Sequence, residues 1–124
     1  MKKVFVFVLF SLGLLAAKAQ KADWPAMHQF HGVMSKTFHP AEEGNLQPLK
    51  DSASSLLAKA VAWQASAVPA GYNAKVTAPI LKKLVRQCGI VKKAVAAGKP
   101  DAELTAQITK AHDIFHEIME KCRE

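Results

Sequence analysis

The sequence has little of several residue types whose abundance would define a special class of protein. It contains two cysteines, six glycines and six prolines among 124 residues. So few cysteines exclude a disulfide-dense scaffold, and these levels of glycine and proline exclude collagen-like and low-complexity chains. Half of the residues are hydrophobic and 22% are charged, a balance typical of a folded chain rather than a disordered one. A chain of this length forms one small domain.

The first 19 residues predict a signal peptide. A basic start is followed by an apolar run over residues 4–15, and Ala17 and Ala19 place small residues where signal peptidase cleaves. The run is shorter than the about 20 apolar residues that a membrane-spanning helix needs. We therefore expect secretion across the inner membrane, cleavage after Ala19, and a single periplasmic domain over residues 20–124.

The mature chain carries only a mild positive charge. Of the 17 basic residues, three belong to the signal peptide, so 14 remain against 10 acidic ones, a net charge of +4. Nucleic-acid binding usually requires a dense basic cluster or stripe, whereas adjacent cations occur here only at Lys82–Lys83 and Lys92–Lys93. We interpret the lysines as solvated helix faces and expect neither nucleic acid nor a membrane as a partner of the mature protein.

Apolar residues recur three and four positions apart throughout the mature chain, which is the period of a helix. The first helix is predicted over residues 23–38, with Asp23 as N-cap and His39–Pro40 as its end. Its inward side chains are expected to be Trp24, Met27, His31, Met34 and Phe38.

Three further helices follow from the same pattern. The second is predicted over residues 48–68, the third from a cap at Thr77 to residue 97, and the last over residues 101–123 with Asp101 as its cap. The inward residues of the second helix are expected to be Leu49, Ala53, Leu56, Leu57, Ala60 and Trp63 or Gln64. Those of the last helix are Leu104, Ile108, Ala111, Phe115, Ile118 and Cys122. Short loops between four such helices predict an all-α, up-down-up-down four-helix bundle.

The less common side chains of the mature chain are concentrated in two short segments. All five histidines, all three mature methionines and all three mature phenylalanines lie in residues 27–39 or 112–119. In the predicted topology, the start of the first helix and the end of the last lie at the same end of the bundle. We therefore expect the two segments to be neighbours and to form the functional site.

Helical geometry predicts how the histidines face. At about 100° per residue, His31 falls within the apolar stripe of the first helix and points at the core, while His28 and His39 share one flank. On the last helix, His112 and His116 are one turn apart, so that both imidazoles can bind one ion.

Imidazole together with thioether suits copper, and imidazole together with carboxylate suits zinc or nickel. The sequence therefore predicts a transition-metal site between the first and last helices. Its candidate ligands are His31, His112, His116, His28, His39 and Met119. The same residues also fit a bundle without a cofactor, because single histidines on apolar faces often bond to backbone or water, and methionines often fill gaps in cores.

The two cysteines are not expected to pair with each other. In the predicted hairpin, Cys122 lies about 18 Å beyond the level of Cys88 at helical rise, whereas bridged Cα atoms are usually within about 7 Å. Cys88 is then either an additional soft ligand or an inert buried thiol. Cys122, near the open end of the bundle, could link two copies in a homodimer.

Met27 lies early in the first predicted helix, and His112 and His116 lie late in the last. In these positions the chain is similar to cytochrome b562, and its size, helix order and export signal resemble the cytochrome b562 and cytochrome c′ bundles. The resemblance implies noncovalent haem b, with Met27 and either His112 or His116 as axial ligands, for electron transfer or haem carriage.

The sequence departs from that family in two ways. It has no Cys-x-x-Cys-His motif, which excludes covalent haem attachment. It also has five histidines where haem b needs one or two, and the surplus imidazoles together with methionine favour a bare ion over haem. We also find no catalytic nucleophile, no glycine-rich phosphate loop and no paired inward carboxylates. The prediction is a non-enzymatic metal-binding bundle, with haem binding and a cofactor-free interaction bundle as alternatives. The redox chemistry of a bound ion, and the protein partner, stay open.

Overall fold

The computed structural model describes residues 23–123, which form four helices. They are α2 (Pro25–Glu42), α3 (Gln47–Ala65), α4 (Ala74–Ala96) and α5 (Asp101–Lys121). Within residues 23–123 no strand is present, and the only strand-like pairing there is one isolated bridge between Tyr72 and Arg123. The predicted all-α class and the four-helix bundle are confirmed. The predicted signal peptide lies outside the described residues.

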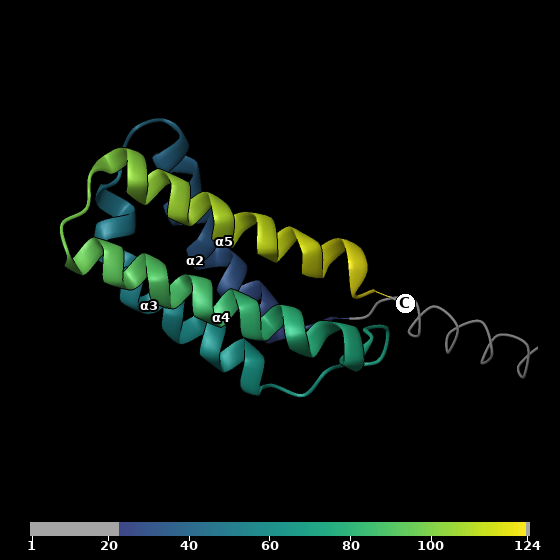
Figure 1. Cartoon of the computed structure of the whole chain (residues 1–124). Coiled ribbons are helices and arrows are strands. Elements are labelled where there is room, and N and C mark those ends of the chain that lie inside the picture. The colour runs from purple at the N-terminus through teal and green to yellow at the C-terminus, as the bar shows by residue number, and fades with distance from the viewer. Residues whose placement is uncertain (1–22, 124) are drawn as a thin grey trace, which may run out of the picture.

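The four helices pack in a ring. Each helix contacts the next one along the chain, and α5 closes the ring against α2 (Figure 1). In the described part of the chain, α2 makes no comparable contact with α4, which lies diagonally across the bundle. The first and last helices of the described chain are therefore neighbours, which is the arrangement that brings the two histidine segments together.

Helix α2 runs further than its sequence predicts. The expected end at His39–Pro40 is wrong, because Pro40 lies inside the last turn of the helix. Proline removes only one backbone donor there, and the turn is stabilised beyond it. The amide of Gly44 donates to the Ala41 carbonyl at 3.0 Å, and that of Asn45 donates to the Pro40 carbonyl at 2.9 Å. Gly44 has a φ of +87°, as this type of helix end requires.

The start of α2 also differs from the prediction. Trp24, rather than Asp23, is the N-cap residue, and no side chain of the described residues caps this helix. The Asp23 carboxylate instead lies 2.6 Å from Nε2 of His28. The Asp23 side chain therefore pairs with the His28 imidazole and does not cap the helix.

Helix α4 begins several residues before the expected cap at Thr77. Its N-cap is Asn73, whose side-chain oxygen accepts from the amides of Lys75 at 3.1 Å and Val76 at 3.2 Å. Thr77 lies within the helix, and its buried hydroxyl donates to the Asn73 carbonyl at 2.6 Å. The sequence offers two capping residues four positions apart, and the structure uses the first.

The other helices agree more closely with their predicted ranges. Helix α3 ends at Ala65, three residues early, where the Ser66 hydroxyl donates to the Trp63 carbonyl at 2.6 Å. In α5, Pro100 is the N-cap residue, so Asp101 is the first helical residue rather than the cap. All six inward positions predicted for the last helix are buried.

The core corrects one prediction that matters for the site. His31 is exposed, and its neighbour Phe30 is fully buried in its place. The buried stripe of α2 centres near Met34, about 60° around the helix from His31. Burial of a large apolar ring lowers the free energy of the fold more than burial of an imidazole does. The helix is therefore rotated so that Phe30 is buried. In α3, Trp63 is buried, Gln64 is exposed and Leu57 is only partly buried.

Both cysteines are buried and free. Burial raises the pKa of the Cys88 thiol to about 12.

Among residues 23–123, no helix combines the length and the apolar character that crossing a bilayer requires.

Candidate metal centre

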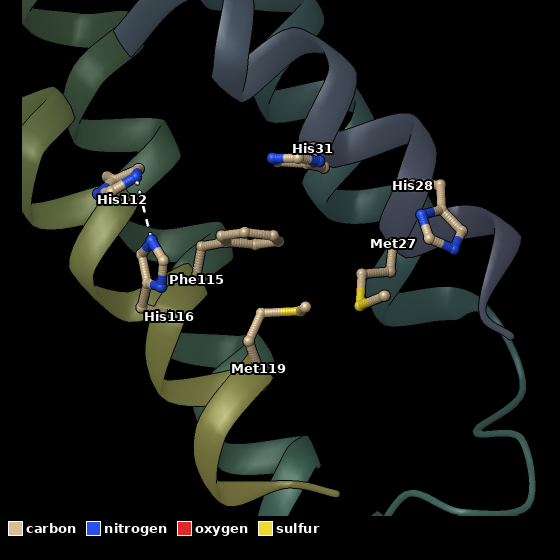
Figure 2. A pocket seen from close by; sticks show the side chains of 7 residues that line it. All are labelled: Met27, His28, His31, His112, Phe115, His116 and Met119. Atoms are coloured by element: carbon tan, nitrogen blue, oxygen red, sulfur yellow. Dashed lines mark hydrogen bonds between the residues drawn. The ribbon is translucent and has the colours of Figure 1, made fainter. Parts of the chain in front are cut away.

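A pocket of about 410 Å³ lies between the start of α2 and the end of α5. Side chains from both histidine segments line it, as Figure 2 shows. The lining residues are Met27, His28, His31, His112, Phe115, His116 and Met119. The expected convergence of the two segments is therefore present in the structure.

The α2 wall of the pocket consists of Met27, His28 and His31. Met27 is buried, and the Tyr72 hydroxyl donates to its sulfur at 3.7 Å. The His31 ring stacks on Phe115 of α5, with ring centroids 5.2 Å apart and planes 5° from parallel. This stack joins the two walls and keeps the His31 imidazole at the pocket.

The α5 wall carries the closest pair of imidazoles. Nε2 of His112 and Nε2 of His116 are 3.2 Å apart, which is the dashed line in Figure 2. A hydrogen bond between them requires one Nε2 to carry a proton and the other to offer a lone pair. At least one imidazole of the pair is therefore neutral.

Apolar surroundings bias His112 toward its neutral form. Its ring stacks on Phe38 of α2, with centroids 3.8 Å apart and planes 9° from parallel. The pKa of His112 is lowered below its ordinary value of 6.5, first by burial and then by repulsion from His116 and, more weakly, His39. The carboxylates of Asp113 and Glu42 act in the opposite direction without reversing the shift. A neutral imidazole is the form that binds a metal ion.

The separation of the two Nε2 atoms also suits coordination. Metal–imidazole bonds of about 2.0–2.1 Å place two ligand nitrogens roughly 2.9 Å apart at a right angle and about 3.4 Å apart at the tetrahedral angle. The observed 3.2 Å lies between these values. A two-nitrogen site additionally requires both lone pairs to turn toward a common point, because the hydrogen bond directs one of them at the other ring.

The full set of predicted ligands is not assembled. Within residues 23–123, no group of three or more histidine, cysteine, aspartate or glutamate side chains is placed to hold one ion. Nε2 of His28 lies 2.6 Å from the Asp23 carboxylate, and Nδ1 of His39 lies 3.3 Å from Glu42. Neither His39 nor Cys88 is among the residues that line the pocket. A complete coordination shell therefore has to include thioether sulfur or water beside the His112–His116 pair.

Sequence reasoning missed one contributor to the site. Tyr72 comes from the loop between α3 and α4, which is distant in sequence from both histidine segments, yet its buried hydroxyl reaches Met27. Tyr72 is the only tyrosine of the chain, and its largely apolar ring favours burial. No local pattern, however, indicates which residue it contacts.

In comparisons with known proteins, no family model, no curated protein and no solved structure matches the chain.

Proposed function

We propose that the protein binds a transition-metal ion, namely copper, zinc or nickel, in the pocket between α2 and α5, and that it acts without being an enzyme. The observation that carries the proposal is the His112–His116 pair, whose Nε2 atoms are 3.2 Å apart at the pocket wall. The thioether of Met27, which lines the pocket from α2, is the donor that completes a shell linking the two helices. Removal of the ion is expected on acidification, because protonated imidazoles cannot bind it.

Export to the periplasm by residues 1–19 and the up-down-up-down order of the bundle belong to the same proposal. The basic start, the apolar run and the small residues at 17 and 19 support export. Expression of the full chain in a bacterium tests it directly. We expect the protein in the periplasmic fraction with Gln20 as its first residue, and full-length protein in the cytoplasm would contradict export.

Metal analysis of the purified protein tests the binding proposal. We expect one ion per chain by mass spectrometry, either as isolated or after addition of Cu(II), Zn(II) or Ni(II) and gel filtration. The double variant His112→Gln/His116→Gln is expected to lose it. His39→Gln is a matched control, because it removes an imidazole that does not line the pocket, and it should retain the ion. A folded protein that refuses zinc, nickel and copper in either oxidation state would reject the proposal and leave the haem and cofactor-free alternatives.

Noncovalent haem b is the second candidate. It is favoured by one observation, namely that Met27 on α2 and His116 on α5 line the same pocket from different helices, since axial ligands have to reach the iron from opposite faces of the haem. The resemblance to cytochrome b562 bundles has the same basis. A Soret band on addition of haemin, lost in Met27→Leu and in His112→Gln/His116→Gln, would favour haem over a bare ion. An unchanged haemin spectrum would exclude it.

A further inference from the structure

We propose that the preferred ion is a soft monovalent one, Cu(I), bound by the thioethers of Met27 and Met119 together with the His112–His116 pair. This inference rests on the proposed function and specifies its ligand. Three observations carry it: the placement of the methionines, the absence of hard ligands from the pocket, and a hydrogen bond that orients one of the sulfurs.

The methionines are placed on both sides of the pocket. Met27 projects from α2 and Met119 from α5, and in Figure 2 their side chains extend toward one another. Met34 is buried as well, but it is not a lining residue. Thioether sulfur binds Cu(I) well and is a poor ligand for zinc or nickel.

The residues that line the pocket offer an ion no negatively charged ligand. None of them is a carboxylate or a cysteine. The Born cost of removing an ion from water rises with the square of its charge, so a divalent ion loses about four times as much hydration as a monovalent one of equal size. Neutral sulfur and neutral imidazole therefore favour a monovalent ion over Zn(II) or Ni(II).

Tyr72 is a positioning residue for one of the sulfurs. Its hydroxyl donates to Sδ of Met27 at 3.7 Å. The ring is tilted against Trp24, with centroids 5.0 Å apart, and the Asn73 amide next to it donates to the Cys122 carbonyl of the α5 end at 2.7 Å. The hydrogen bond occupies one lone pair of the sulfur and leaves the other for an ion. Partners that hold a metal ligand in this way commonly change affinity by about 10–100-fold.

Competition with a chromophoric Cu(I) chelator under anaerobic, reducing conditions tests the thioethers. We expect Met27→Leu/Met119→Leu to weaken Cu(I) binding by about 100-fold or more, while Zn(II) binding to the same variant changes little. Leucine conserves the volume of methionine, so the fold should persist by circular dichroism. The matched control Met34→Leu replaces a methionine outside the pocket and should bind Cu(I) as the parent protein does.

A second variant and a spectroscopic readout keep the test independent of folding. Tyr72→Phe removes only the hydroxyl and is expected to weaken Cu(I) binding roughly tenfold without weakening Zn(II) binding. X-ray absorption at the copper edge should show two sulfur neighbours in the parent protein and one in Met119→Leu.

The outcomes separate this inference from the proposed function. Zn(II) or Ni(II) binding at least as tight as Cu(I), or a Cu(I) spectrum with nitrogen neighbours alone, would overturn the thioether site and leave metal binding by imidazoles intact. If Cu(I), Zn(II), Ni(II) and Cu(II) all fail to bind, both proposals are rejected.

Discussion

His112 shows how one side chain combines the physical effects that prepare a site. It is partly buried, its ring stacks on Phe38, and its Nε2 lies 3.2 Å from that of His116. Burial and the second imidazole both disfavour the protonated form, and the pKa falls below 6.5. The result is an imidazole that offers a lone pair near neutral pH.

We expect NMR titration of the ring protons to give His112 a pKa below 6.5. Substitution His116→Gln removes one of the two main causes of the lowering, so the His112 pKa should rise toward 6.5 in that variant. An unchanged value would show that burial alone accounts for the shift.

The same shift predicts a pH dependence of stability. The folded protein takes up the His112 proton less readily than the unfolded chain, so the fold loses stability as pH falls below 6.5, and this effect is absent well above 6.5. In urea unfolding at pH 7 and pH 5, His112→Gln should lose less stability on acidification than the parent protein. Equal losses would contradict the assignment.

Burial also keeps Cys88 in its neutral form, but for a thiol this means a raised pKa and low reactivity. Its thiol is fully buried and has a pKa of about 12, so almost no thiolate forms at neutral pH. We expect neither Cys88 nor the buried Cys122 to react with a thiol reagent at pH 8 in the folded protein, and both to react in denaturant. Rapid labelling of Cys122 in the folded state would instead support the predicted cross-link between two copies.

At the scale of the elements, the helix ends depend on a few backbone positions. Gly98 follows α4 with a φ of +64°, and its amide donates to the Val95 carbonyl at 3.1 Å. Gly89, inside α4, has no such requirement, and a Cβ added there would meet nothing within 4 Å. The two glycines of one helix therefore have different physical roles.

We expect Gly98→Ala to destabilise the protein by about 1 kcal/mol, because an L-residue resists the left-handed conformation. Gly89→Ala should stabilise it by about 0.5–1 kcal/mol, because alanine has the higher helix propensity. Urea unfolding of both variants measures the difference. Destabilisation by Gly89→Ala would contradict the open space around this position.

At the scale of the whole molecule, the pocket belongs to α2 and α5 together. These helices are distant in sequence but packed side by side, so an ion bound to both restrains the closure of the bundle. Any ligand that binds only the folded state shifts the unfolding equilibrium toward that state.

We expect a bound ion to raise the thermal unfolding midpoint. At a free ion concentration about 100 times Kd, the stabilisation is about 2.7 kcal/mol, which raises Tm by roughly 10 °C or more in a domain of this size. Differential scanning calorimetry with and without the ion measures the shift, and His112→Gln/His116→Gln should abolish it. A shift that persists in the double variant would place the ion elsewhere.

The fold class and the place of the pocket could be predicted from local patterns combined with the packing of neighbouring helices in a bundle. Helical periodicity is recognised from apolar residues three and four positions apart, and all six inward positions predicted for the last helix, five of them in α5 and Cys122 directly after it, are buried. The clustering of histidine and methionine at two places in the chain, joined by the bundle topology, was sufficient to predict that both segments line one pocket.

Tertiary packing decided the rest. Whether Phe30 or His31 enters the core depends on a rotation of α2 by about 60°, which its neighbours set and no local pattern encodes. The contact of Tyr72 with Met27 and the exclusion of His39 from the pocket depend on segments far apart in sequence. The sequence by itself thus determined which residues are available to the pocket. Only the packed bundle decided which of them face it, because side-chain direction follows from the burial of large apolar groups over the whole molecule.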